Sequence, residues 1–177
     1  LERSAGLFNQ ITPGKPDQDL LNPGFPAFDF DAILGVRYEI NLSRPPMFDK
    51  DGHVIHPDAG RIVHLTFDGA PVADDMQFIV ATNNYRAGGG GNFPGTGDTI
   101  IFEGPDTNRD VVVRYISKHG TITPSTQINW RFAPMPGTTV LFNTGPKAAD
   151  HIGDVKGVTI EPAGDGPDGF ARYRISL

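Results

Sequence analysis

Two stretches of the chain alternate apolar and polar residues with the two-residue period of a half-buried β-strand. In residues 35–42 the apolar positions are Val36, Tyr38, Ile40 and Leu42. In residues 61–68 one face holds Ile62, His64 and Thr66, and the other holds Val63, Leu65 and Phe67. The pattern predicts that the two strands pair as a hairpin across a long polar loop, and Asp68-Gly69 predicts a tight turn after the second strand.

Less regular patterns fill the rest of the first half of the chain. Residues 1–10 have the spacing of a short helix end, and the prolines and glycines of residues 12–27 predict an irregular connection. Residues 78–81 form an uninterrupted apolar run, which predicts a short buried strand. Together with the hairpin, this strand predicts an antiparallel or mixed sheet.

The second half of the chain combines one helix with several short strands. A capping residue among Asp106, Thr107 and Asn108 predicts a helix that runs to about Lys118 and is closed by Gly120. Strands are predicted at 128–132 and 139–142, a helical turn at 146–151, and a final hairpin at 158–160 and 170–175. We therefore expect one α+β domain over residues 1–177, with a mixed or antiparallel sheet and few helices.

Composition narrows the functions that such a fold can serve. The chain has 22 glycines, 16 prolines and 38% hydrophobic residues, which is typical of a loop-rich globular protein. Its formal net charge of −6 argues against a protein that coats a nucleic acid polymer, because phosphate contacts need clustered cations. The absence of cysteine excludes disulfides and thiol nucleophiles, and the sequence has no apolar run of the roughly 18 residues that a membrane span needs. Since the chain begins without Met, we expect a fragment of a longer protein.

Residues 82–97 concentrate the side chains best suited to binding a small molecule. Polar residues and one aromatic ring precede four consecutive glycines, Gly88 to Gly91, and Asn92 and Phe93 follow them. A glycine run weakens helices and strands, so it indicates either a flexible connection or a close approach of the backbone to a ligand. Tyr85 offers a stacking surface for a base, and asparagine carries the donor and acceptor that suit a base edge. Both interpretations remain open at this point.

The other motifs carry less specific chemistry. His53 and His56 have His-x-x-His spacing close to Asp49 and Asp51, but the segment is rich in turn residues and further metal ligands are not evident. A solvated loop between two strands is the competing interpretation. Asp49 to Gly52 is similar to the start of a calcium loop, yet the glutamate that closes such a loop is missing, which favours a tight turn. No pair of carboxylates has a spacing that argues for acid–base catalysis.

Several stretches together resemble the C-terminal domain of the bacterial 5′-nucleotidase family. The most specific one runs from Val80 to Ala87 and continues through the glycines to Phe93 and Gly95-Thr96-Gly97-Asp98. The others are residues 1–5 with 8–11, 35–40, 61–62 with 67–72, and 129–134. The resemblance extends nearly from end to end and is closest to the periplasmic branch that combines 2′,3′-cyclic-nucleotide 2′-phosphodiesterase with 3′-nucleotidase activity.

This resemblance implies a division of labour between two domains. In the family, an N-terminal metallophosphoesterase domain holds two divalent metal ions and performs the hydrolysis. The C-terminal domain clamps the nucleoside base between two aromatic rings, and Tyr85 matches one of them. The second ring and all the metal ligands belong to upstream sequence, so this chain is expected to contain no catalytic residue and no cofactor and to be inactive alone.

The expected partners are therefore a nucleotide and the protein's own N-terminal domain, rather than a nucleic acid polymer or a membrane, and the expected location is the periplasm. The substrate contacts implied by position are Tyr85, Asn83, Asn84, Arg86, Gly89, Gly90 and Asn92.

One departure from the family pattern bears on the substrate. The 5′-nucleotidase members place an aspartate in the glycine loop, where it binds the free ribose 2′ and 3′ hydroxyls, whereas this chain has Gly90, Gly91 and Asn92 there. A carboxylate would repel a phosphate carried by those oxygens, so its absence favours a 3′-nucleotide or a 2′,3′-cyclic phosphate. Two alternatives remain, a 5′-nucleotidase or UDP-sugar hydrolase domain, and a non-catalytic ligand-binding or adhesion module.

Overall fold

The computed structural model describes residues 1–97, 99–123 and 127–177, which fall into two compact units. The first unit comprises Leu1–Val72 and Asn129–Leu177 and holds two four-stranded sheets. The second unit, Ala73–Ile128, holds the helices α1 and α2. The predicted α+β class is confirmed. Among the described residues, no helix combines the length and the apolar character that a membrane crossing would require. That residues 1–177 act as one family domain stays a prediction.

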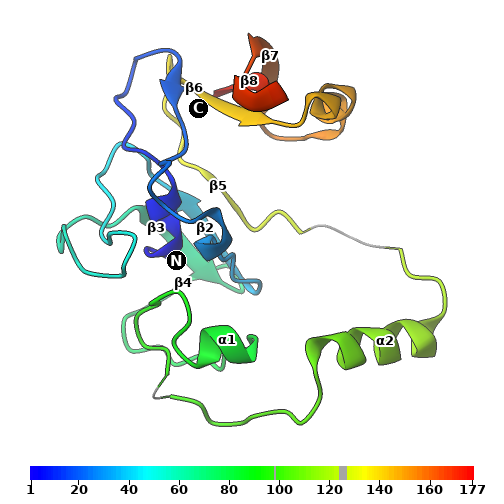
Figure 1. Cartoon of the computed structure of the whole chain (residues 1–177). Coiled ribbons are helices and arrows are strands. Elements are labelled where there is room, and N and C mark those ends of the chain that lie inside the picture. The colour runs from blue at the N-terminus through cyan, green and yellow to red at the C-terminus, as the bar shows by residue number, and fades with distance from the viewer. Residues whose placement is uncertain (98, 124–126) are drawn as a thin grey trace. The chain divides into compact units, whose positions relative to one another are not determined.

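The first sheet is built around the predicted hairpin. Strands β2 (Val36–Ile40) and β3 (Ile62–Phe67) pair antiparallel, and β5 (Trp130–Phe132) joins β2 in parallel (Figure 1). The short strand β4 (Ala70–Pro71) returns against β3 and gives the order β4-β3-β2-β5. Asp68 and Gly69 have φ values of 48° and 82°, the two positive angles that a type I′ turn needs, so the predicted tight turn is confirmed. The sheet is mixed, as expected.

The face assignment of β3 was wrong because the strand contains a bulge. The register between β2 and β3 shifts between Arg37 and Glu39, and His64, opposite this shift, has a φ of 53°. The bulge lets Ile62 and Leu65 both pack against the core, although strict alternation places them on opposite faces. An extra residue in one strand reverses the facing of everything beyond it, and a hydrophobic pattern alone does not locate that residue.

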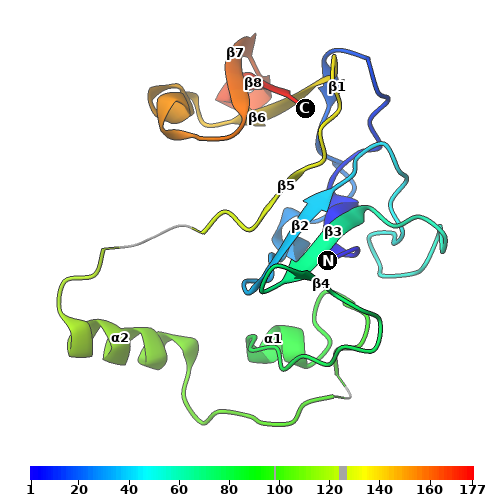
Figure 2. The same ribbon diagram turned by 180° about the vertical axis from the view of Figure 1, so that it is seen from behind.

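The second sheet combines one strand from the first segment of this unit, Leu1–Val72, with three strands from its second segment, Asn129–Leu177. Its order is β1-β6-β8-β7, where β1 is Gln18–Asp19, β6 is Thr139–Thr144, β7 is Thr159–Asp165 and β8 is Ala171–Ser176 (Figure 2). β7 and β8 form the predicted final hairpin, and the predicted helical turn is part of the longer 3₁₀ segment Pro146–Asp154. β1 lies in the stretch predicted to be irregular, because two residues are too few to show a period.

The core of the first unit connects both sheets through the N-terminal segment. Ser4–Leu7 form a short 3₁₀ helix, briefer than the helix end predicted from residues 1–10, and a second 3₁₀ turn covers Ala27–Asp29. Rings of Phe8, Phe30, Trp130 and Phe132 pack edge-to-face or tilted at centroid distances of 5.0–6.3 Å. The buried apolar residues around them are Ala5, Leu7, Ile11, Leu20, Phe25, Tyr38, Ile40, Leu42, Met135, Val140 and Ile175.

A surface ion pair between Asp17 and Arg174 connects the residue before β1 with strand β8 of the second sheet. Asp17 accepts hydrogen bonds from Nε and Nη2 of Arg174 at 2.6 and 2.8 Å and from the Thr139 hydroxyl at 2.9 Å. The Arg174 bonds are the main cause that lowers the pKa of Asp17 from 3.8 to about 2. A carboxyl with a depressed folded-state pKa stabilises the fold above its unfolded pKa and loses that contribution as the pH falls.

We therefore expect the unfolding midpoint of the wild-type chain to fall between pH 4 and pH 2 in part through Asp17, the window set by its two pKa values. Asp17→Asn should reduce this pH dependence, and asparagine tolerates the positive φ of 55° at this position. Urea titrations of both proteins at several pH values in this range measure the effect. Equal pH slopes would show that the pair contributes nothing to folding.

The second unit departs most from the expectations. Residues 78–81 do not form a buried strand: Phe78, Ile79 and Val80 lie in irregular backbone with 45%, 85% and 60% of their surfaces exposed. An apolar run becomes a strand only where a neighbouring strand offers hydrogen bonds, and none of the described strands pairs with it. The helix α2 (Asn108–His119) is as predicted, with Thr107 and Asp110 forming a capping box and Gly120 ending it at a φ of 72°.

Candidate functional site

The candidate site begins at the short helix α1 (Asn84–Ala87), which opens the glycine loop. The Asn83 side-chain oxygen accepts the backbone N–H of Arg86 at 2.8 Å and so caps this helix. The loop is closed on itself by backbone hydrogen bonds, because Gly90 N–H donates to the Tyr85 carbonyl at 2.8 Å and Gly97 N–H to the Ala87 carbonyl at 2.8 Å. The loop is therefore a folded turn, and the flexible-linker interpretation of its glycines is wrong.

Gly90 is the glycine that the geometry of Tyr85 requires. A Cβ atom at position 90 would lie 2.5–2.6 Å from three carbons of the Tyr85 ring, closer than non-bonded carbon atoms approach one another. The aromatic ring thus rests directly on the backbone of Gly90. Tyr85 nevertheless keeps 61% of its surface exposed, so the ring remains open on the side away from Gly90. A ring supported on one side and open on the other is what stacking of a base requires.

Arg86 lies behind this arrangement rather than at its surface. The residue is only 8% exposed, and its Nη1 donates to the Gly90 carbonyl at 2.8 Å. The guanidinium carbon lies 4.3 Å from the centroid of the Phe93 ring and 5.6 Å from that of Tyr85, which are cation–π distances. The cation therefore connects α1 with both ends of the glycine turn.

The other predicted contacts line the exposed surface of the same loop. Asn84 and Asn92 are exposed, whereas Gly89 is partly covered. Gly89, Gly91 and Asn92 have φ values of 94°, 80° and 55°, conformations that glycine and asparagine tolerate best. The structure thus gathers all seven predicted residues into one turn, within which Asn83 serves as a cap. Their contacts with a substrate remain predictions.

The charge of this segment is unusual for so acidic a chain. Residues 82–97 contain no aspartate and no glutamate, and Arg86 is their single charged residue, although the whole chain carries a net charge of −6. A largely buried guanidinium in a segment of this composition contributes positive charge close to the loop surface. The segment is therefore compatible with an anionic ligand such as a nucleotide.

A second cluster of polar side chains lies in the loop between β2 and β3. Ligand atoms of Asp49, Asp51 and His53 approach within 4.8 Å of one another, while His56 is bonded through Nδ1 to the Pro46 carbonyl at 2.8 Å. Asp49 Oδ1 accepts the backbone N–H groups of Asp51 and His53, both at 2.9 Å, and the hydrogen bond from His53 is the main cause that lowers the pKa of Asp49. The ammonium of Lys50 lies 2.7 Å from Asp51. These contacts favour the predicted tight turn.

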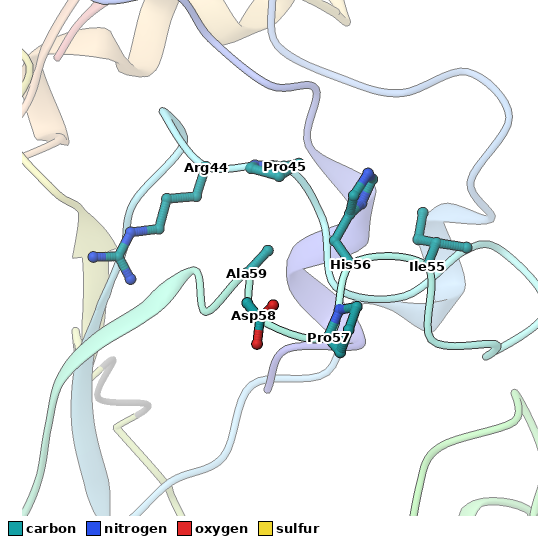
Figure 3. A pocket seen from close by; sticks show the side chains of 7 residues that line it. All are labelled: Arg44, Pro45, Ile55, His56, Pro57, Asp58 and Ala59. Carbon is teal, nitrogen blue, oxygen red and sulfur yellow. The ribbon is translucent and has the colours of Figure 1, made fainter.

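The residues of this cluster do not fit a two-metal hydrolytic centre. Such a centre needs ligands for two ions, whereas the cluster offers three side chains, of which one is bound to backbone amides and another to a lysine. An open hollow of about 500 Å³ in the same loop is no better suited. Figure 3 shows the residues that line this hollow. Two of its polar side chains bind backbone carbonyls of the loop: Arg44 donates to the Gly60 carbonyl at 2.6 Å, and His56 is bonded to that of Pro46.

Comparison with known proteins assigns the chain to a class. The family model described as 5′-nucleotidase, C-terminal domain, matches residues 1–98. The chain therefore belongs to this family, as its motifs predicted.

The similarity to individual relatives is closer still. The chain is 40% identical to the 2′,3′-cyclic-nucleotide 2′-phosphodiesterase/3′-nucleotidase of Haemophilus influenzae and 43% identical to that of Salmonella typhimurium, in both cases over the whole chain. A trifunctional nucleotide phosphoesterase protein of Bacillus subtilis is 42% identical over 88% of the chain. The chain spans 29% of the length of the first two relatives and 11% of the third. No solved structure matches the chain significantly.

One residue of the site escaped the sequence reasoning. The sequence indicates Phe93 only as part of the motif, yet its ring lies nearer to the Arg86 guanidinium than the Tyr85 ring does. The spacing of a cation and an aromatic residue seven positions apart, across a glycine run, is the signal that would have indicated this contact.

Proposed function

We propose that this chain is the nucleoside-binding part of a hydrolase that acts on 2′,3′-cyclic nucleotides and 3′-nucleotides. The observation that carries the proposal is the Tyr85 ring, which rests on Gly90 and is open on its other side, in a segment, residues 82–97, whose sequence contains no carboxylate. Family membership and the names of the relatives support the same function.

In this proposal the chain binds and orients the substrate, and the chemistry takes place elsewhere in the protein. Tyr85 stacks on the base, and Asn84 and Asn92 supply polar contacts at the rim of the loop. A metallophosphoesterase domain with two divalent metal ions supplies the activated water. Since every base has a π face, we expect broad base preference. The location that we propose is the periplasm, in line with the branch that the sequence resembles.

Substitution of Tyr85 tests the proposal in the full-length protein. Tyr85→Ala should raise the KM for adenosine 3′-monophosphate about tenfold or more, because base–aromatic stacking contributes roughly 1–3 kcal/mol. The kcat should change little, since the ring binds substrate and transition state alike. Tyr85→Phe keeps the stacking surface and should retain the wild-type KM.

Tyr115→Ala provides the matched control, because Tyr115 is an exposed tyrosine of the same unit with 54% of its surface accessible. An unchanged KM in Tyr85→Ala would remove Tyr85 from the site. Comparable hydrolysis of adenosine 5′-monophosphate and adenosine 3′-monophosphate by the wild-type protein would instead contradict the proposed branch and favour a 5′-nucleotidase.

A further inference from the structure

Arg86 is the single charged residue of segment 82–97. Its burial differs from that expected of a side chain that contacts a substrate from solution. Its side chain is almost completely covered, with 8% of the residue exposed, and it donates to the Gly90 carbonyl. Its backbone N–H is held by the Asn83 cap. A guanidinium that binds a phosphate from solution normally keeps its planar fork accessible. The Arg86 contacts described above are made to the loop itself.

Both backbone polar groups of Gly90 are hydrogen-bonded to nearby residues. Its N–H donates to the Tyr85 carbonyl at 2.8 Å, and its own carbonyl accepts from Arg86 at the same distance. The Tyr85 ring lies on this peptide so closely that no Cβ fits between them. Arg86 therefore fixes the surface on which the ring rests.

Phe93 completes the support from the far end of the turn. Its ring centroid lies 4.3 Å from the Arg86 guanidinium carbon, whereas that of Tyr85 lies 5.6 Å away. The planar guanidinium can stack on one ring and donate a hydrogen bond in its own plane, a combination that a lysine ammonium does not offer. Replacing the residue would leave Gly90 and Phe93 without their common partner.

We infer that Arg86 is a positioning residue, which holds the Gly90 peptide and the Phe93 ring and thereby presents the open side of Tyr85 to a nucleoside base. The inference rests on the proposed function, and it assigns to Arg86 an indirect role in place of the direct substrate contact predicted from the sequence. Its measurable consequence is that Arg86 affects substrate binding only when Tyr85 is present.

A double-mutant cycle in the full-length protein tests this statement, with adenosine 3′-monophosphate as the probe. Arg86→Met, which retains the length and the apolar stem, should raise KM about tenfold with kcat nearly unchanged, by analogy with the loss of one base-stacking contact. In the Tyr85→Ala background the same substitution should raise KM no further, because the residue that it positions is already gone. Arg86→Lys should restore only part of the wild-type KM.

Two controls separate this outcome from others. Arg109→Met removes an exposed arginine at the start of α2 and should leave KM unchanged. Inorganic phosphate should inhibit wild type and Arg86→Met with the same Ki, since the guanidinium does not hold the phosphate in this scheme. If Arg86→Met does not accumulate as folded protein, the Arg86→Lys and Tyr85→Ala pair supplies the cycle.

The possible results distinguish failure of this inference from failure of the proposed function. Additive effects of Arg86→Met and Tyr85→Ala, or a weaker Ki for phosphate, would overturn the positioning role and assign Arg86 to the substrate itself. An unchanged KM in Arg86→Met alongside a raised KM in Tyr85→Ala would also overturn it while leaving the proposed function in place. An unchanged KM in Tyr85→Ala would contradict both.

Discussion

Replacing Arg61 with alanine is expected to destabilise the first unit by about 3–5 kcal/mol, because it removes three hydrogen bonds from a buried charged donor, each contributing roughly 1.5 kcal/mol or more. Arg61 is completely buried, and its guanidinium donates to the carbonyls of Ala5 and Phe8 at 2.8 and 2.7 Å. Its Nε donates to the Arg44 carbonyl at 2.8 Å. Burial lowers its pKa to about 10, so the side chain stays charged at neutral pH. Alanine would remove the guanidinium donor from all three carbonyls, of which that of Ala5 would keep the Phe8 N–H at 3.3 Å.

Urea unfolding followed by the fluorescence of Trp130 measures this effect cleanly, because Trp130 is the single tryptophan of the chain and packs against the same core. Arg37→Ala is the matched control, since Arg37 is an exposed arginine in β2 and should cost less than about 0.5 kcal/mol. Arg61→Lys should not rescue the fold, because one ammonium cannot reach the carbonyls that the guanidinium spans. A stability loss equal to that of Arg37→Ala would show that the network is dispensable.

The second large effect is expected at Gly90. Under the proposed function, Gly90→Ala should raise the KM for adenosine 3′-monophosphate by about tenfold to a hundredfold, at least as much as losing the stacking ring. The new methyl group would occupy the space of the Tyr85 ring and displace it toward the side on which the base stacks. Because the displaced ring is largely exposed to solvent, we expect the unfolding transition to change little.

Gly104→Ala is the matched control for this substitution. It lies in the same unit, and its added Cβ would meet the Phe102 ring at 3.7 Å, an ordinary contact distance. Steady-state kinetics and urea unfolding of both variants separate binding from stability. Equal KM values for the two variants would contradict the described packing of Tyr85 on Gly90.

Regular elements of both units could be predicted where each shows its own local signal. β2 and β3 alternate apolar and polar residues, Asp68-Gly69 has the side chains that a type I′ turn needs, and Thr107 with Asp110 marks the start of α2. Signals that depend on distant partners were missed. The apolar run 78–81 predicts a strand only if another strand pairs with it, and the bulge at His64 follows from packing rather than from pattern.

At the candidate site, the sequence predicts which residues come together, but it does not predict which of them are exposed and which support the others. Tyr85 and the glycines were predicted as one site, and the structure places them in one turn. The reason for Gly90 differs from the expected one, since the backbone approaches the Tyr85 ring. The burial of Arg86 could not be predicted, because a charged residue next to glycines is exposed by default.

The pairing of β1 with β6 has a consequence for how the protein is made. Asp17 and Thr139, which are hydrogen-bonded, lie 122 residues apart, and β6 in turn pairs with β8, which follows it in the sequence. At a synthesis rate of roughly 10 residues per second, the ribosome produces β6 on the order of ten seconds after β1, so β1 lacks its partner strand during that time. The segment around β1 must therefore stay unaggregated until β6 and β8 have been synthesised, because this sheet cannot be completed earlier.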